Sequence, residues 1–344
     1  MTTSSAKVDG KRVKEALLKA NLVEGEVSLT SLSGGVSSQV WLVTSSGRRV
    51  VAKTPLAKLA TPLDWFSDIS RGQVEADSLR LLRGLTPEHV PEVLFFDADV
   101  PLLVLEAAPI HWRDWRQVLL SESDSEPDAD GFADLQTIEY SKNFGAKLWR
   151  LLAIWHSRTV NVEGLPESIK SGERLQQLRT NPFHRATAAA IGDSVLAARL
   201  LYLAEELEST RKCLVYGDFS PENFLVANDG LWVIDAETAH ISDPVLDLAF
   251  LNAHLNLKAM RKPGLTAAMK AGQSSFMGAY LQTASGANSN EGLEERLSRH
   301  TGAILAARVL GVSQANYLSD TSRQTALGKA KRLLGDKASY LIEH

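Results

Sequence analysis

Residues 214–237 read LVYGDFSPENFLVANDGLWVIDAE, and the rest of the chain can be placed around this stretch. Apolar residues flank a polar turn from Asp218 to Asn223, and the tripeptide NDG at 228–230 separates two further apolar runs. Asp-Gly between apolar runs is a strong signal for a β-hairpin, so we expect Asp235 to follow the second strand of that hairpin. The stretch therefore predicts three polar side chains close together on short, rigid elements.

These side chains have the types and the spacing that phosphoryl transfer requires. The carboxylate of Asp218 can orient an attacking hydroxyl, while the amide oxygen of Asn223 and the carboxylate of Asp235 can hold magnesium on nucleotide phosphates. Glu237 adds a carboxylate two residues further on and is an additional candidate metal ligand. The alternative interpretation is two buried strands with ordinary polar turn residues. We favour the catalytic interpretation because the spacing suits both a base and a metal site.

A resemblance supports this choice. The segment YGDFSPEN at 216–223 resembles the His-Gly-Asp-x-x-x-x-Asn loop of the aminoglycoside phosphotransferase and choline kinase superfamily, with Tyr216 in place of the usual His. The segment DAE at 235–237 resembles the metal-binding Asp of that superfamily, which replaces the Asp-Phe-Gly of protein kinases. Residues 243–249, DPVLDLA, resemble its Asp-Pro-x-x-Asp-Leu-Ala motif. The resemblance implies that Asp247 accepts backbone hydrogen bonds and supports the catalytic turn.

A second glycine-containing segment, SGGVSS at 33–38, lies between two predicted strands. Paired glycines followed by serines let backbone amides approach a phosphate closely, although Gly-Gly hairpins are also common for other reasons. The segment resembles the Ser-Gly-Gly-x-Ser-Asn loop of the same superfamily, with Ser38 in place of the Asn. The resemblance implies that the nucleotide contacts Ser33, Gly34, Gly35 and Ser37.

Lys53 ends an apolar predicted strand, where it either marks a surface strand end or points inward. A helix is predicted from the capping-box pattern SRGQ at 70–73 to Gly84. Glu75 shares one face of that helix with two leucines, and a carboxylate on an apolar face needs a buried cation. We therefore expect Lys53 and Glu75 to pair. Their pair resembles the kinase-fold Lys and Glu that position the α- and β-phosphates.

The resemblance also implies the domain organisation. We expect a protein-kinase-like α+β fold, with a small antiparallel β-rich lobe at 1–107 that binds ATP. A larger, mainly helical lobe at 108–344 would carry the catalytic residues and the acceptor site. In the superfamily, backbone groups of the segment between the lobes bind adenine, which assigns Glu106 and Ala108 to nucleotide binding from their order along the chain.

Helices are predicted for much of the second lobe. Residues 140–156 read as a long helix that ends at His156, which is either catalytic or a packed structural histidine. Residues 160–180 show less regular patterning, and residues 186–210 are strongly helical. Residues 245–344 read as about four helices, whose apolar periodicity indicates core packing.

Acidic residues suggest a preference for the acceptor. The segment 121–134 is either an exposed, mobile acidic loop or an acidic lip that attracts cationic substrates. Other acidic and aromatic residues are close in sequence to the proposed site, and both kinds favour cations. The sequence therefore suggests a small-molecule acceptor that carries a hydroxyl and an amine, in the neighbourhood of Trp112, Trp115, Glu222, Glu237 and Asp243.

Composition restricts the other possibilities. The 344 residues carry a formal net charge of −4, which argues against a nucleic-acid partner. Cys213 is the single cysteine, which excludes an internal disulfide framework. No signal-peptide pattern and no membrane-length apolar run is present, so we expect a cytoplasmic protein without a membrane partner. The sequence gives no indication of oligomeric state.

Three functional hypotheses remain. Only seven residues separate Asp235 from Asp243, which leaves no room for a protein-kinase activation segment. A nucleotide-binding pseudoenzyme is disfavoured because every charged catalytic position is filled. We therefore predict an enzyme that uses ATP and Mg²⁺ to phosphorylate a hydroxyl of a small molecule.

Overall fold

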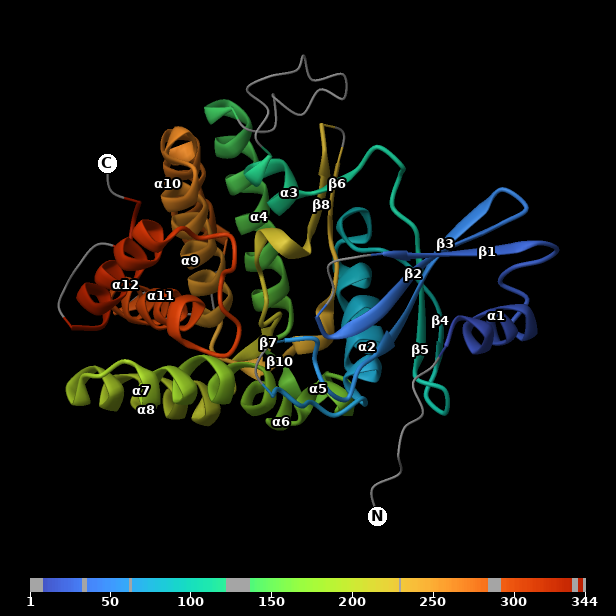
Figure 1. The fold of residues 1–344 in the computed structure, drawn as a ribbon, viewed down its shortest axis with the longest axis horizontal. Coiled ribbons are helices and arrows are strands. Elements are labelled where there is room, and N and C mark those ends of the chain that lie inside the picture. Colours follow the sequence, from blue (N-terminus) through green and yellow to red (C-terminus); the bar gives the residue numbers. More distant parts are fainter. Residues whose placement is uncertain are drawn as a thin grey trace.

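The computed structural model describes residues 9–32, 36–61, 64–121, 137–228, 230–283, 292–335 and 340–342. Figure 1 shows a β-rich lobe beside a larger helical lobe, which confirms the predicted α+β architecture. The β-rich lobe contains α1 (Gly10–Lys19), β1 (Val27–Leu32), β2 (Ser38–Ser45), β3 (Arg48–Pro55), α2 (Arg71–Leu85), β4 (Val93–Asp97) and β5 (Leu102–Glu106).

The sheet of this lobe has the order β1-β2-β3-β5-β4, and all neighbouring strands are antiparallel. Helix α1 covers one face, and α2 lies on the face toward the helical lobe (Figure 1). Side chains of β5 alternate between the two faces. Leu102 and Val104 pack in the cluster that includes α1, while Leu103 and Leu105 join the core that continues into the helical lobe. Burial on both faces explains why the strand is apolar throughout.

The ends of α2 differ from the prediction. Ser70 has helical backbone angles and makes no capping hydrogen bond, because its hydroxyl instead accepts from Arg174 of the helical lobe at 2.6 Å. The predicted capping box is therefore wrong, although the helix does begin at Arg71. Gly84 does not end the helix, which continues to Leu85. The helix stops at Thr86 because the residue before a proline is disfavoured in helical conformation.

The helical lobe begins with the short strand β6 (Arg113–Asp114). Its larger helices are α3 (Trp115–Leu120), α4 (Ile138–Arg158), α8 (Ser194–Ser209), α9 (Val245–Arg261), α10 (Thr266–Thr283), α11 (Leu293–Leu310) and α12 (Asp320–Gly335). Shorter helical pieces are α5 (Glu167–Lys170), α6 (Glu173–Leu175), a π-helix (Gln176–Arg185) and α7 (Ala186–Ala190). Its other strands are β7 (Cys213–Val215), β8 (Phe224–Ala227), β9 (Gly230–Val233) and β10 (His240–Ser242).

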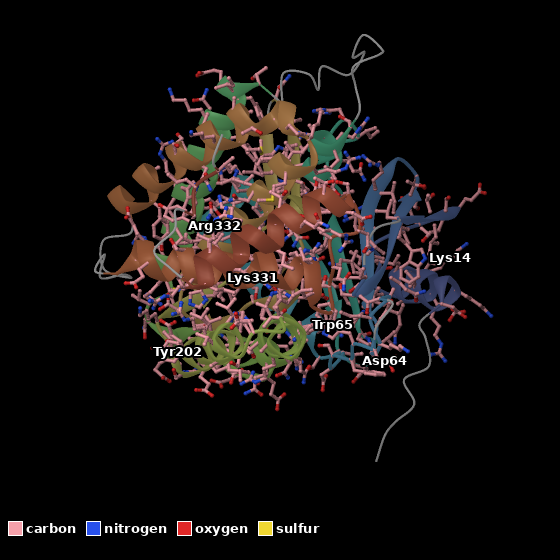
Figure 2. The ribbon with its side chains drawn as sticks, turned by 60° about the vertical axis from the view of Figure 1, so that its left-hand side comes forward. Lys14, Asp64, Trp65, Tyr202, Lys331 and Arg332 are labelled. Atoms are coloured by element: carbon pink, nitrogen blue, oxygen red, sulfur yellow. The ribbon has the colours of Figure 1, made fainter. Side chains whose placement is uncertain are left out.

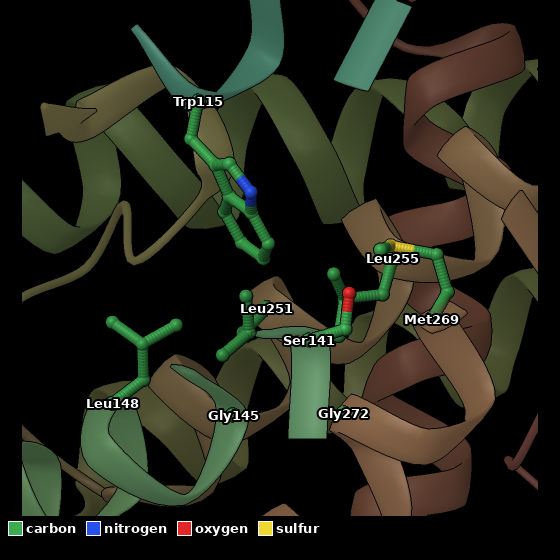
Figure 3. Close-up of a pocket in the computed structure, with 8 residues that line it drawn as sticks. All are labelled: Trp115, Ser141, Gly145, Leu148, Leu251, Leu255, Met269 and Gly272. Carbon is green, nitrogen blue, oxygen red and sulfur yellow. The ribbon is translucent and has the colours of Figure 1, made fainter. Parts of the chain in front are cut away.

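Helix α9 forms the centre of this lobe, and α4 and α10 pack beside it (Figure 1). Helices α4 and α10 approach so closely that a Cβ on Gly145 would lie 2.4 Å from the carbonyl oxygen of Gly272. Figure 3 shows an apolar cavity near this crossing. It has room for only about one water molecule, so it is a packing gap rather than a substrate site. Its apolar lining comes from Trp115, Leu148, Leu251, Leu255 and Met269.

A short segment of the β-rich lobe, residues 64–68, docks on the helical lobe, and we call it the interlobe strap. Trp65, which lies low in Figure 2 where the two lobes meet, donates from Nε1 to the carbonyl oxygen of Gln177 at 2.9 Å. The side-chain oxygen of Gln177 accepts from the Ser67 hydroxyl and from the Asp68 amide, each at 3.1 Å. The interlobe strap therefore connects the lobes in addition to the covalent linker. Within the described part of the chain, no helix is both long and apolar enough to cross a lipid bilayer.

Candidate active site

The predicted catalytic turn follows β7. Gly217 has a φ of +85°, and a Cβ there would lie 2.7 Å from the carbonyl oxygen of Thr238, so both the backbone conformation and the available space require glycine. Asp247, in the first turn of α9, accepts from the backbone amides of Tyr216 and Gly217, each at 2.7 Å. These are the backbone hydrogen bonds that the sequence leads one to expect, and they fix the turn to the most buried helix of the lobe.

Two other buried side chains support the turn. His156 lies between Asp247, at 3.1 Å from Nε2, and the hydroxyl of Tyr280, at 3.0 Å from Nδ1. It is 1% exposed, so it is the packed structural histidine of the two alternatives. Tyr216 stacks on Trp155 and donates its hydroxyl to the carbonyl oxygen of Ile234. The tyrosine thus ties the turn to the segment that leads to Asp235.

Asp218 and Asn223 lie on the turn and on the 3₁₀ turn Pro221–Asn223 that follows it. The Asp218 side chain is 35% exposed, and Oδ2 lies 3.2 Å from NH2 of Arg179. The side-chain nitrogen of Asn223 donates to the carbonyl oxygen of Asp218 at 2.9 Å. This bond orients the amide of Asn223 and leaves its side-chain oxygen as the group that can bind a cation.

Asp235 follows the β8–β9 hairpin in a left-handed backbone conformation, with φ 72° and ψ 53°. Non-glycine residues rarely adopt it, and such strain is concentrated at functional sites. Lys53, at the end of β3, reaches Oδ1 of Asp235 at 2.7 Å and Oε1 of Glu75 at 2.6 Å. The predicted Lys53–Glu75 pair therefore forms, and it extends to Asp235.

The carboxylate oxygens of Glu75, Asp235 and Glu237 lie within 4.8 Å of one another. Burial raises the pKa of Glu75, Lys53 opposes this shift, and the neighbouring carboxylates Asp235 and Glu237 add to it. Burial lowers the pKa of Lys53, but Asp235 and Glu75 outweigh it, so the pKa is raised overall. Hard oxygen donors with excess negative charge are the environment that Mg²⁺ prefers. The residues present therefore fit a magnesium ion.

Residues 28–271, more than half of the chain, match the model of the phosphotransferase enzyme family. The chain belongs to this family.

Individual relatives are distant. Methylthioribose kinase 1 of Oryza sativa subsp. japonica is 23% identical over 257 residues, which cover 69% of this chain but only 58% of that protein. A microcompartment-associated aminopropanol kinase has a TM-score of 0.55 at 17% identity, with 94% of each chain covered. The ADP-bound aminoglycoside phosphotransferase APH(2'')-Ib has a TM-score of 0.53 at 16% identity, with 95% of this chain and 97% of that chain covered. At such identities the structural neighbours show the kinase-like fold alone.

Arg71 is a central residue of this site that sequence reasoning missed. It is fully buried in the first turn of α2, and its Nε donates to Glu237 at 3.1 Å. The same guanidinium donates to backbone carbonyls at the end of the glycine segment, after β3 and in the strap, namely those of Ser37, Leu56, Ser67 and Asp68. The only signal in the sequence was a cation one residue after the expected helix cap. Glu237 is therefore held by a protein cation as well as being close to the other carboxylates.

The remaining predicted nucleotide contacts are less well defined. Ser33, Gly34 and Gly35 lie outside the described residues. Ser37 is buried, and its carbonyl points to Arg71. Glu106 ends β5 with a side chain that is 41% exposed and 3.6 Å from Arg83, and the carbonyl oxygen of Ala108 accepts from Arg49 at 3.3 Å. The contacts of Glu106 and Ala108 with adenine stay predictions.

Two of the acidic residues that suggested an amine on the acceptor already have cationic partners in the structure. Glu222 pairs with Lys258 at 2.9 Å and with His254 at 3.0 Å. Asp243 pairs with Lys212 at 2.7 Å and with Arg296 at 2.5 Å. Of the aromatic residues, Trp112 packs against Trp232 and Trp115 is buried in the core, while residues 122–134 of the acidic segment lie outside the described residues. Among the described residues, the charges of Glu222 and Asp243 therefore favour neither a cationic nor a neutral acceptor, and the amine on the acceptor stays a prediction.

Proposed function

We propose that this phosphotransferase moves the γ-phosphate of ATP, with Mg²⁺, to a hydroxyl of a small molecule. The observation that carries the proposal is the position of Lys53, which bonds Glu75 and Asp235 at once at the end of the hairpin that follows the catalytic turn. This arrangement is the one that protein-kinase-like enzymes use to position nucleotide phosphates. The ADP-bound structural neighbour supports the choice of nucleotide.

Each residue then has a role. Lys53, positioned by Glu75, would bind the α- and β-phosphates, and Asp218 would orient the acceptor hydroxyl and receive its proton. Asn223 and Asp235 would hold the metal, with Glu237 as a further ligand that Arg71 positions. When bound, Mg²⁺ would neutralise charge on the phosphate oxygens. In this proposal the β-rich lobe at 1–107 binds the nucleotide, and the lobe at 108–344 binds the acceptor.

The acceptor is a small hydroxyl compound. Relatives and neighbours are named for methylthioribose, aminopropanol and aminoglycosides, which covers both neutral and amine-bearing compounds. An acceptor with an amine, as the sequence suggested, belongs in this set. The paired states of Glu222 and Asp243 give it no advantage over a neutral sugar.

Two measurements test the proposal. Mg·ATP should raise the melting temperature, because a ligand that binds only the native state stabilises it by mass action. Transfer of ³²P from [γ-³²P]ATP should then be screened over sugars, amino alcohols and aminoglycosides. Asp218→Asn should lower that transfer by about 100-fold or more, which is the usual scale for a positioned acid or base. The proposal fails if Mg·ATP leaves the melting temperature unchanged, or if Asp218→Asn is fully active.

A further inference from the structure

Arg179 is a buried arginine whose guanidinium lies against the catalytic turn. It belongs to the π-helix Gln176–Arg185, a rare element that is frequent at functional sites. Its Nε donates to the carbonyl oxygen of Gly217, and its NH1 donates to that of Leu178 at 2.6 Å. Its NH2 lies 3.2 Å from Oδ2 of Asp218, as an ion pair without aligned hydrogen-bond geometry. One side chain therefore contacts two successive residues of the catalytic turn.

The surroundings of Arg179 make Asp218 its natural counter-charge. The side chain is 3% exposed, and the guanidinium carbon lies 5.4 Å from the ring centre of Phe183 and 4.9 Å from that of Phe250. Burial lowers the pKa of Arg179, and Asp218 is the strongest opposing influence. Arginine stays protonated in proteins, and a buried charge requires a partner. The cation is therefore held in place by aromatic rings on one side and by the catalytic turn on the other.

We propose that Arg179 is a positioning residue, which holds Asp218 in the orientation that receives the acceptor hydroxyl. This inference rests on the proposed role of Asp218 as the residue that orients the hydroxyl. Arg179 lies against Oδ2 of Asp218. The other oxygen, Oδ1, accepts from the Ser220 hydroxyl at 3.3 Å and is the one assigned to the acceptor.

The chemistry of the guanidinium suits this task better than that of lysine. Its planar set of donors can bind the Gly217 carbonyl and the Asp218 carboxylate at the same time, whereas an ammonium is a point charge on a flexible stem. In the proposed arrangement Asp218 is the base for the acceptor hydroxyl and Arg179 is the group that orients the base, as the third member of a catalytic triad does. Because the Asp218 side chain is 35% exposed, its carboxylate would without Arg179 be restrained only by the Ser220 hydroxyl among the contacts described above.

The experiment uses Arg179→Met, Arg179→Lys, Asp218→Asn and the double variant Arg179→Met/Asp218→Asn. The readout is hydrolysis of Mg·[γ-³²P]ATP with water as the phosphate acceptor, which requires no identified substrate. The dissociation constant of Mg·ATP and the melting temperature are measured for each protein. Arg185→Met is the matched control, because Arg185 lies on the same π-helix but pairs with Glu208 at 2.6 Å, away from the turn.

We expect Arg179→Met to slow hydrolysis by about 10- to 100-fold, because displacing a reacting group by 1 Å has an effect of this order. The dissociation constant of Mg·ATP should change by less than about threefold, since the loss is confined to the reacting geometry. The double variant should be no more than about threefold slower than Asp218→Asn, because residues that act as a unit are not additive. Arg179→Lys should be intermediate, and Arg185→Met should hydrolyse ATP at the wild-type rate.

The inference is overturned if the two losses multiply in the double variant, or if weaker ATP binding accounts for the slower rate of Arg179→Met. If Arg179→Met does not fold, Arg179→Lys and its double variant with Asp218→Asn decide by the same criteria. Failure of the proposed function gives a different result, in which Asp218→Asn itself hydrolyses ATP at the wild-type rate. A slow Asp218→Asn together with a fully active Arg179→Met refutes the role of Arg179 alone.

Discussion

At the scale of single residues, Lys53 is shared between two carboxylates that have different tasks in the proposed function. Glu75 lies on α2 and is 2% exposed, whereas Asp235 follows β9 with a side chain that is 29% exposed. Asp235, the more exposed carboxylate, is assigned to the metal, and the buried Glu75 is assigned to positioning the lysine. Asp218, the carboxylate assigned to the acceptor, has a third task. Substitutions of Asp235 and of Asp218 should therefore have different effects.

Asp235→Asn and Asp218→Asn should differ in nucleotide affinity. Replacing Asp235 removes a charged ligand of Mg²⁺, and we expect Mg·ATP to bind about tenfold more weakly or worse, the size of effect that loss of a metal-site partner produces. Replacing Asp218 should change that affinity by less than about threefold, because its interaction forms mainly in the transition state. Titration of each variant with Mg·ATP measures the difference, and equal losses would remove the distinction between the two carboxylates.

Arg71→Met should strongly destabilise the protein. The substitution leaves Glu237 buried without its cation, and breaking a buried ion pair in this way costs about 3–5 kcal/mol. Arg80 lies on the same helix, is 48% exposed and is 3.5 Å from Asp77, so Arg80→Met should change the free energy of unfolding by less than about 0.5 kcal/mol. Urea unfolding of both variants gives the comparison. Similar values for the two would show that Arg71 has no special role in joining the lobes.

At the scale of elements, the sequence predicted the contacts that local spacing determines. It missed the contacts that depend on segments distant in sequence. The turn at 218–223, the hairpin after it and the Lys53–Glu75 pair follow from spacing and from the need of a carboxylate on an apolar face for a cation. The start of α2 was misread because the hydroxyl of Ser70 is used by Arg174, which is distant in sequence. The π-helix and the contacts of Arg179 were not predicted, because residues 160–180 lack a regular apolar pattern. Pro182 also interrupts the ordinary helical hydrogen bonding of that segment.

Two glycines in helices should respond oppositely to alanine. Gly145→Ala would place a Cβ 2.4 Å from the backbone of α10, which cannot move aside as a side chain can, and overpacking of this kind costs about 1–3 kcal/mol. Gly84 in α2 has no atom within 4 Å of the added Cβ, so Gly84→Ala should stabilise by up to about 1 kcal/mol through helix propensity. Urea unfolding measures both changes. A stable Gly145→Ala would mean that α4 and α10 can separate at little cost.

At the scale of the whole molecule, buried neutral histidines should make the fold sensitive to acid. Burial lowers the pKa of His184 to about 3, with His300 adding to the shift, and lowers the pKa of His240 to about 4. The unfolded chain, with histidine pKa values near 6.5, binds more protons than the native state between pH 6.5 and these values. The free energy of unfolding should therefore fall as the pH decreases through that range.

His184→Leu provides the test. Each such histidine should lower the free energy of unfolding by about 1.4 kcal/mol between pH 7.5 and pH 5.5. The loss over that interval should be smaller in His184→Leu than in the wild type by that amount, whatever the substitution does to stability at pH 7.5. Urea unfolding of both proteins at the two pH values measures it. An unchanged difference between the two pH values would show that His184 is not held neutral.

The docking of the interlobe strap on Gln177 has a mechanical consequence. A body attached to another at one place can rotate in any direction, and each further attachment removes directions of rotation. The covalent linker after β5 is one attachment, and the bonds of Trp65, Ser67 and Asp68 to Gln177 are another. The pairs Lys53–Asp235, Arg71–Glu237 and Ser70–Arg174 join the same two lobes, so a movement that separates the lobes has to break several buried or partly buried polar contacts together.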